Sequence, residues 1–201
     1  MRLFVAIDLP HSVRERLAWM AGGLPGARWL PPENYHVTLR FIGDIPAWHA
    51  RDVDTALAAI RAPGLTLGLA GIGTQDKAGR VTSIHVRVER SPALDHLRSK
   101  IETALQRAGL ERERRRFAPH VTLARLDQVP EHTIAAWVAQ HNLFRGPPVP
   151  VEHFTLFSSL LGKEQAAYTA EVDYPLNLVA APPIVETALY NPWASLPLEQ
   201  P

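Results

Sequence analysis

The tetrapeptide His-Val-Thr-Leu occurs twice in the chain, beginning once at His36 and once at His120. Alternate residues of a β-strand face the same side and rise about 3.3 Å each. His36 therefore projects together with Thr38, and His120 projects together with Thr122. The valine and leucine of each copy point the opposite way, into a core. Each copy thus predicts a polar pair carried on an apolar anchor.

Two imidazoles that face each other suit acid–base chemistry, because histidine titrates at about pH 6.5. One ring can remove a proton from water while the other delivers a proton to a departing oxygen. Two threonine hydroxyls can donate hydrogen bonds to an anion held between them. A phosphodiester fits this arrangement, whereas acyl transfer fits less well because no serine nucleophile elbow is visible. The residues themselves leave open which histidine is the acid.

A third copy of the pattern begins at His153, in the run His-Phe-Thr-Leu. A single His-x-Thr on a strand is usually a sheet residue, so the short pattern alone is weak evidence. The identical pair gains weight because each copy follows a proline-containing loop that could place its histidine at the end of a strand. We expect His153 to be structural, or to lie at the edge of the site.

The rest of the chain alternates between strand-like and helix-like segments. Helices are expected in four segments, the clearest of which has Ser91 as its N-cap and an apolar face formed by every third or fourth residue. The expected helices are 8–22, 46–60, 91–109 and 131–142. The expected strands are 3–7, 36–43, 65–73, 81–89, 120–126, 151–160 and 166–174, with a polar turn at 74–80. This order predicts an α+β fold with two similar halves.

The composition is that of a globular protein, with 46% hydrophobic and 20% charged residues in 201. The absence of cysteine excludes disulfides and thiolate metal sites. A formal net charge of +1 predicts no strong overall field, so any basic surface must be local. The N-terminal apolar run is too short for a signal peptide, and no stretch reaches the roughly 20 apolar residues that span a bilayer. We expect a cytoplasmic monomer that does not bind a membrane.

Four longer blocks resemble the successive signatures of one family. They read RLFVAIDLP, RWLPPENYHVTLRFIGD, RRFAPHVTLARL and FTLFSSLLGKEQAAYTAEVDYPL. In this order they are similar to the two-histidine phosphoesterase superfamily, and within it to the RNA 2′,3′-cyclic phosphodiesterases, also called 2′-5′ RNA ligases. The resemblance covers residues 2 to about 176. It implies two pseudo-symmetric lobes of antiparallel sheet, with helices on the outer faces and a central groove. One domain would span 1–175, and 176–201 would be an extended or flexible proline-rich tail.

The resemblance also implies an activity, namely hydrolysis of a terminal 2′,3′-cyclic phosphate on RNA to a 2′-phosphate. Neither a metal nor a cofactor is implied, and the partner would be an RNA end such as a tRNA fragment. His36 would be the acid that protonates the leaving 3′ oxygen, and His120 the base that activates water. Reverse 2′-5′ ligation, a small cyclic phosphate nucleotide as substrate, and a non-catalytic RNA-end-binding module stay open as alternatives. A metal-dependent hydrolase is disfavoured, because no His-Glu-x-x-His helix or Asp-rich cluster is present.

Two further arginines lie within the motif strands. Arg125 matches a family arginine that contacts the RNA end, yet strict alternation puts it on the opposite face from His120 unless the strand bulges. Arg40 shares the alternation of His36 and Thr38, so it is expected either to line the groove or to be exposed to solvent.

The residues just before each motif are further candidates for binding RNA. Tyr35 and Phe117 could stack on a base, although loop aromatics more often pack against their own lobe. The run 111–117 places several arginines before the second motif, of which Arg115 and Arg116 lie nearest to it. Such a run is usually a solvated loop, but its position makes it the best candidate for gripping RNA phosphates.

Overall fold

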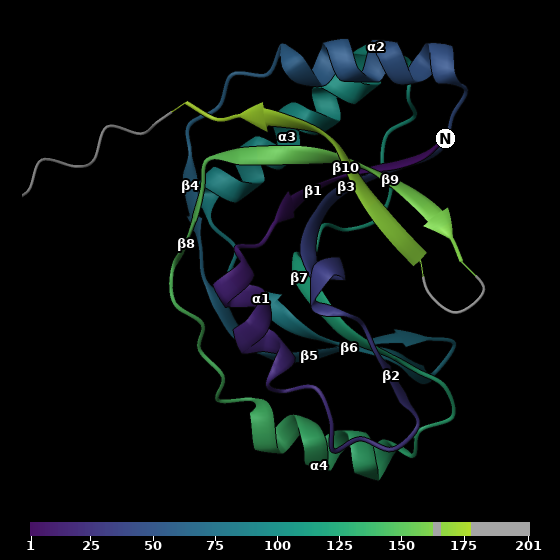
Figure 1. Ribbon diagram of the computed structural model, residues 1–201, viewed down its shortest axis with the longest axis vertical. Coiled ribbons are helices and arrows are strands. Elements are labelled where there is room, and N and C mark those ends of the chain that lie inside the picture. The colour runs from purple at the N-terminus through teal and green to yellow at the C-terminus, as the bar shows by residue number, and fades with distance from the viewer. Residues whose placement is uncertain (163–165, 178–201) are drawn as a thin grey trace, which may run out of the picture.

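The computed structural model describes residues 1–162 and 166–177, and its strands form two four-stranded antiparallel sheets and one two-stranded pair (Figure 1). The first sheet has the order β10 (Ala166–Pro175), β9 (His153–Leu161), β1 (Arg2–Asp8) and β3 (His36–Asp44). The second sheet has the order β2 (Ala27–Trp29), β7 (His120–Leu126), β6 (Arg80–Val88) and β5 (Leu69–Lys77). The short pair joins β4 (Leu65–Leu67) to β8 (Val149–Val151).

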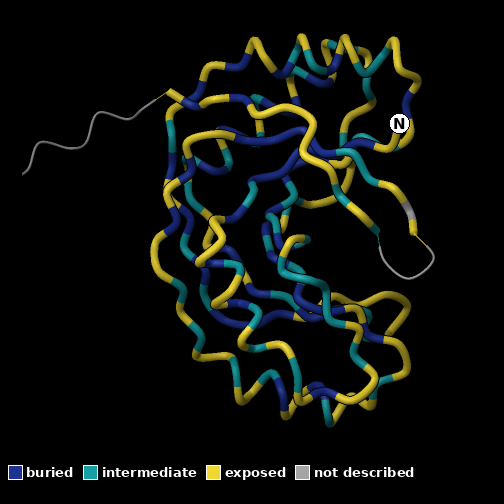
Figure 2. The backbone as a smooth tube through the Cα atoms, viewed as in Figure 1, coloured by how far each residue is buried: buried dark blue, intermediate teal, exposed yellow. Residues whose placement is uncertain are grey.

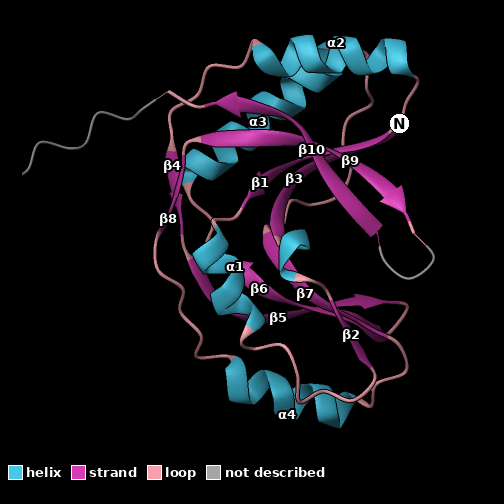
Figure 3. Cartoon of the chain, viewed as in Figure 1, coloured by secondary structure: helices cyan, strands magenta, loops and turns pink. Residues whose placement is uncertain are grey.

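Helices lie at both ends of this arrangement, and the first helix lies between the ends (Figure 3). They are α1 (His11–Ala18), α2 (Ala47–Ala58), α3 (Pro92–Arg107) and α4 (Glu131–His141), with a 3-10 turn η1 (Pro32–Asn34). Helices α2 and α3 pack on each other beside the first sheet, and α4 lies at the opposite end, beside the second. The expected α+β class, with antiparallel sheets and helices outside them, is confirmed. None of the described helices is long and apolar enough to cross a membrane.

The two lobes are interleaved along the chain and are not successive halves. The first sheet takes β1 and β3 from the N-terminal part and β9 and β10 from the C-terminal part. The second sheet takes β5, β6 and β7 from the middle of the chain and β2 from between β1 and β3. The physical reason lies in β1, where every residue from Leu3 to Ile7 is buried. Such a strand needs a partner on each edge and cover on each face, and β9 supplies the second edge. The two similar lobes that were expected are present as two four-stranded antiparallel sheets, but each lobe is not one half of the chain.

A single apolar cluster joins both lobes (Figure 2). Helix α3 contributes the face that its spacing predicts, because Leu94, Leu97, Ile101 and Leu105 are all buried. The hydroxyl of Ser91 accepts a hydrogen bond from the backbone N–H of Leu94 at 3.2 Å, which confirms the expected N-cap. This helix thus anchors the lobe that carries β3.

Two local expectations fail in the region 65–80. The strand expected over 65–73 is divided into β4 and β5, which belong to different sheets. The polar segment expected to be a turn is mostly strand, because β5 continues to Lys77 and only two residues turn the chain. These are Ala78 and Gly79, with φ of 52° and 77°. A two-residue turn with positive φ at both positions matches the twist of the strands that it joins.

The C-terminal boundary falls slightly later than the composition suggests. Leu176 is buried, and the backbone N–H of Asn177 donates to the carbonyl of Ala62 at 2.8 Å. These two residues are bound to the fold. The rest of the expected tail, 178–201, lies outside the described residues.

Candidate active site

The two motif histidines begin strands β3 and β7, which are in contact with each other. Each ring is fixed in the same way. Nδ1 of His36 lies 2.9 Å from the carbonyl oxygen of Asn34, and Nδ1 of His120 lies 2.7 Å from that of Ala118. A carbonyl can only accept, so Nδ1 carries the hydrogen and Nε2 of each neutral ring is unprotonated. Both rings therefore present Nε2 for proton transfer.

The two threonines differ in what they contact. The hydroxyl of Thr38 lies 3.1 Å from Nε2 of His36, and it donates to that nitrogen when the ring is neutral. Thr122 is half-buried and lies opposite His85 of β6 in the strand ladder. The predicted pairing of each histidine with a threonine on one strand face is thus present in both motifs.

A β-bulge follows each motif. In the β1–β3 ladder, Ala6 pairs with Thr38 and Val5 with Arg40, so Leu39 is the extra residue. In the β6–β7 ladder the extra residue is Leu123, and its carbonyl accepts a hydrogen bond from the N–H of Leu30 at 2.8 Å. A bulge shifts the alternation of side chains by one position. The residues after it therefore lie on the faces opposite to those that strict alternation predicts.

The second bulge brings Arg125 to the face of His120 and Thr122. Arg125 is exposed, and its positive charge helps to lower the pKa of His36, so its field reaches the other motif. The strand bulge that would bring Arg125 to this face, which the sequence alone did not decide, is present. Phe41 holds the equivalent place in β3 and is 53% exposed.

The first bulge turns Arg40 away from the histidines. Its side chain is 8% exposed, and its Nε lies 2.9 Å from Oε2 of Glu102 on α3. The guanidinium also contacts the carbonyl of Glu111 and lies 3.8 Å from the carboxylate of Glu113. The expectation that Arg40 lines the groove or is exposed is wrong, because strict alternation does not continue through Leu39. Arg40 instead ties α3 and the following loop to β3.

Tyr35 also lies in the core. It is 1% exposed, and burial, followed by the negative charge of Glu33, raises its pKa to about 12. Its hydroxyl has no hydrogen-bond partner in the part of the chain that the structure describes. One residue before His36, Tyr35 shares the inward direction of Val37, so its ring cannot stack on a base. That expectation is corrected.

The candidates before the second motif have different surroundings. Phe117 packs against the main core, and the guanidinium carbon of Arg98 lies 5.6 Å from the centre of its ring. This favours the packing alternative for Phe117. Arg115 and Arg116 are exposed, and neither forms an ion pair within residues 1–162 and 166–177. Their contact with RNA stays a prediction.

Aromatic rings surround His36, a feature that the motif does not reveal. The centroid of its ring lies 4.9 Å from that of Phe4, 5.2 Å from Tyr168 and 6.0 Å from Phe157. Burial lowers the pKa of His36 to about 4, the hydrogen bond to Asn34 opposes that shift, and the charges of His120 and Arg125 add to it. The ring is therefore neutral at pH 7 in the free protein. The only sequence feature that could have indicated this aromatic environment of His36 is the set of aromatic residues in the strands β1, β9 and β10.

A third histidine stands beside the second motif. The ring of His85 on β6 lies 4.5 Å from the ring of His120, centroid to centroid. Burial lowers the pKa of His85 to about 4, with smaller contributions from His120 and Arg87. Its Nδ1 is buried and has no hydrogen-bond partner among the described residues. Sequence reasoning noted only the strand character of this segment, because the pairing of β6 with β7 is long-range.

His153 lies apart from these groups, at the start of β9. It is exposed, and its Nε2 is 3.9 Å from the carboxylate of Asp173 on the neighbouring strand. Thr155, the threonine of the third motif copy, is buried and donates to the same carboxylate at 2.6 Å. This copy holds β9 to β10, in keeping with a structural role.

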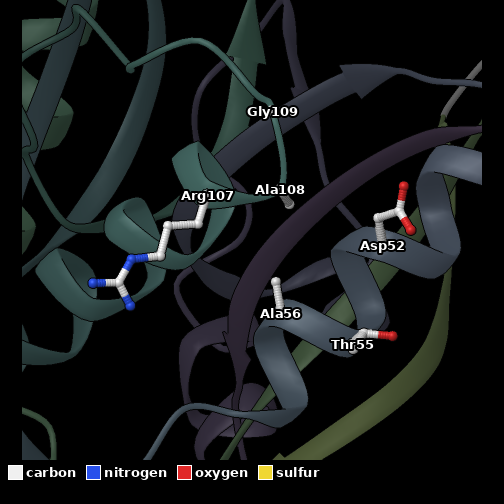
Figure 4. Close-up of a pocket in the computed structure, with 6 residues that line it drawn as sticks. All are labelled: Asp52, Thr55, Ala56, Arg107, Ala108 and Gly109. Carbon is white, nitrogen blue, oxygen red and sulfur yellow. The ribbon is translucent and has the colours of Figure 1, made fainter.

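A surface pocket elsewhere is unrelated to the histidines (Figure 4). It lies between α2 and the C-terminal end of α3 and is lined by Asp52, Thr55, Ala56, Arg107, Ala108 and Gly109. None of these residues belongs to a motif strand. Over the described residues, no group of three or more His, Asp or Glu side chains is placed to hold a metal ion.

Comparisons with known proteins agree with this geometry. A protein of Escherichia coli (strain K12) named RNA 2′,3′-cyclic phosphodiesterase is 32% identical over 176 residues, which cover 84% of this chain and 92% of that protein. One of the same name from Geobacillus stearothermophilus is 33% identical over 128 residues, 61% of this chain and 41% of that protein. The crystal structure of E. coli LigT complexed with 3′-AMP matches with a TM-score of 0.69 and 27% identity, over 87% of this chain and 97% of the other. The family model described as LigT like Phosphoesterase matches residues 7–81 and 86–168, and the chain belongs to this family.

Proposed function

We propose that this chain hydrolyses the terminal 2′,3′-cyclic phosphate of RNA to a 2′-phosphate, without a metal ion. The observation that carries the proposal is the matched setting of His36 and His120 at the starts of two contacting strands, each with Nδ1 bound to a backbone carbonyl and Nε2 unprotonated. The names of the relatives, RNA 2′,3′-cyclic phosphodiesterase, support the substrate.

Proton transfer at the two Nε2 atoms accounts for the whole reaction. Nε2 of His120 accepts a proton from water as the water oxygen forms a bond to phosphorus. The bond from phosphorus to the 3′ oxygen breaks, and protonated His36 gives its Nε2 proton to that oxygen. The phosphate remains on the 2′ oxygen. His120 ends protonated and His36 neutral, and exchange with solvent restores both.

His36 must gain a proton before it can act as the acid. Its pKa of about 4 leaves the ring neutral at pH 7 in the free protein. An anionic phosphodiester placed beside the ring favours the charged form and raises this pKa. Protonation of His36 therefore accompanies substrate binding, and Nε2, now a donor, no longer accepts from Thr38. The threonine hydroxyl is then free to donate to a phosphate oxygen.

The second lobe stabilises the negative charge on the phosphate oxygen that Thr38 does not bind. Thr122 lies on the face of His120 and donates to the other non-bridging oxygen. Arg125, brought to that face by the bulge at Leu123, supplies a planar cation suited to a phosphate. All of these groups belong to one chain, so we further infer that a monomer is sufficient. RNA ends such as tRNA fragments, in a reducing cytoplasm compatible with a chain that has no cysteine, are the inferred substrates.

Replacement of each histidine by asparagine tests the proposal. His36→Asn and His120→Asn keep an N–H donor near the backbone carbonyl but lose the titrating ring, so each should lower kcat by roughly 10²- to 10⁴-fold on a cyclic-phosphate oligonucleotide. His153→Asn is the matched control and should retain wild-type activity. Normal turnover by either motif variant would rule out the proposed roles. Activity per chain that is constant across protein concentration supports a monomer.

A further inference from the structure

The strand face that carries His120 and Thr122 continues beyond them onto β6 and β5. In the β6–β7 ladder, His120 lies opposite Arg87 and Thr122 lies opposite His85. In the β5–β6 ladder, His85 lies opposite Gly73. Residues directly opposite each other in a ladder share a face of the sheet. The side chains of His85 and Arg87 therefore extend the catalytic face away from the first lobe.

Gly73 makes room for both of these side chains. A Cβ at this position would overlap Nε2 of His85 and would lie 3.0 Å from Nε of Arg87. A side chain at this position would force the His85 ring to move and would push Arg87 aside by a few tenths of an ångström. The side chains of His85 and Arg87 can pack directly against the backbone of β5 because residue 73 is glycine. Their nitrogens consequently converge over one point of the sheet.

The positive charge at this point has no ion-pair partner among the residues that the structure describes. Arg87 is exposed, and it forms no ion pair with any residue in the described ranges. The nearest carboxylate along the chain is Glu89, but its side chain leans over Gly68, where a Cβ would overlap its Oε2. His85 leaves Nδ1 buried without a hydrogen-bond partner in the same described part. The guanidinium of Arg87 and the imidazole of His85, each with hydrogen-bonding capacity that the described residues do not use, thus lie together beside His120.

We propose that Arg87 and His85, above Gly73, form a subsite for the phosphate that links the terminal nucleotide of the RNA to the nucleotide before it. This inference rests on the proposed function. Neighbouring strands are about 4.8 Å apart, so the point above β5 lies roughly 10 Å across the sheet from β7. Arg87 starts from β6, one strand nearer to β7, so the backbone of one nucleotide and the long arginine side chain together cover this distance. The subsite makes the protein selective for oligonucleotides over cyclic mononucleotides.

A comparison of three substrates tests the subsite. They are a 2′,3′-cyclic mononucleotide, a dinucleotide that ends in the same cyclic phosphate, and the same dinucleotide with an uncharged methylphosphonate linkage. For the wild-type protein, kcat/KM should be roughly tenfold higher for the charged dinucleotide than for the other two, as expected for one charge-assisted contact. Arg87→Ala should remove this preference and leave kcat/KM for the mononucleotide unchanged.

Two further variants sharpen the comparison. Gly73→Ala, which displaces both side chains, should reduce the preference as Arg87→Ala does. Arg80→Ala, at the other end of the same strand and also exposed, is the matched control and should keep it. Rescue of part of the preference by Arg87→Lys would show that the charge, and not the fold, is responsible.

Distinct results separate this inference from the proposed function. Equal kcat/KM for all three substrates, or an equal loss on all three in Arg87→Ala, would overturn the subsite while hydrolysis itself stands. Inactivity of the wild-type protein on every substrate would overturn the proposed function. In that case, calorimetric binding of the dinucleotide 2′-phosphate should still weaken about tenfold in Arg87→Ala, and unchanged binding would overturn the subsite as well.

Discussion

Phe41 and Arg125 occupy the same place in the two motif strands, β3 and β7, each three residues beyond the threonine of its motif and each just past a bulge. One is aromatic and the other cationic, and this contrast extends to their neighbours. The ring of Phe41 lies 6.2 Å from that of Phe4, which in turn contacts Phe157 and Tyr168. Arg125, by contrast, shares its sheet face with Arg28 and Arg87. The first lobe thus surrounds its motif histidine with aromatic rings, and the second places cationic side chains beside its own.

Arg125→Ala should lower kcat/KM on a cyclic-phosphate oligonucleotide by roughly 10- to 100-fold, because a charge-assisted contact with phosphate is lost. Arg125→Lys should recover only part of the loss, since lysine keeps the charge but not the planar fork. The side chain is exposed, so the free energy of unfolding should change by less than about 0.5 kcal/mol. Full activity in steady-state kinetics of Arg125→Ala would contradict the placement.

Arg40 should behave in the opposite way. Arg40→Ala leaves Glu102 buried without its close partner, and breaking a buried pair in this way costs about 3–5 kcal/mol. Arg98, which lies 3.3 Å from the same carboxylate, places the expected loss toward the lower value. Urea denaturation measures the change, with Arg61→Ala as an exposed control. An unfolding free energy equal to that of the wild-type protein would show that Arg40 does not tie α3 to β3.

The protonation of His36 can be followed directly by NMR. In the free protein its pKa should lie near 4, below the ordinary value of about 6.5, because aromatic side chains exclude water from the ring. Addition of 2′-AMP, an analogue of the product end, should raise this pKa, because the phosphate favours the charged imidazole. A pKa that does not move on binding would exclude His36 as the group that protonates the 3′ oxygen.

Stability should rise with pH between about 4 and 6.5. His36 and His85 have folded-state pKa values of about 4, below the unfolded value of about 6.5, so the unfolded chain binds more protons in this window. The contribution is full above pH 6.5 and is lost as the pH falls toward 4. His85→Phe should make the slope of thermal stability against pH shallower. A slope equal to that of the wild-type protein would argue against a suppressed charge at His85.

The sequence was informative where a pattern is local. The paired motifs located both histidines and both threonines, and helical spacing predicted the buried face of α3. Strict alternation also explains why Tyr35 points into the core with Val37. It failed at Arg40 and Arg125 because bulges at Leu39 and Leu123 depend on how β3 and β7 pair with other strands. In each strand, one extra residue reversed the faces of the residues that follow it directly.

Long-range strand pairing also explains why the sequence did not reveal the other residues around the two motif histidines. His85 and Arg87 reach the site only because β6 pairs with β7, and Phe157 and Tyr168 reach His36 only because β9 and β10 join β1. These pairings link segments that are distant in the chain, so neither composition nor periodicity marks them. The interleaving of the lobes follows from the same long-range contacts.

The most direct test of the central claim is the product of the reaction in the presence of a chelator. The purified protein is incubated with an oligonucleotide that ends in a 2′,3′-cyclic phosphate, in excess EDTA, and the position of the remaining phosphate is identified by NMR. With His120 activating water and His36 protonating the 3′ oxygen, we expect full activity and a 2′-phosphate as the sole product. A 3′-phosphate, or activity that disappears with EDTA and returns with added metal, would contradict the account.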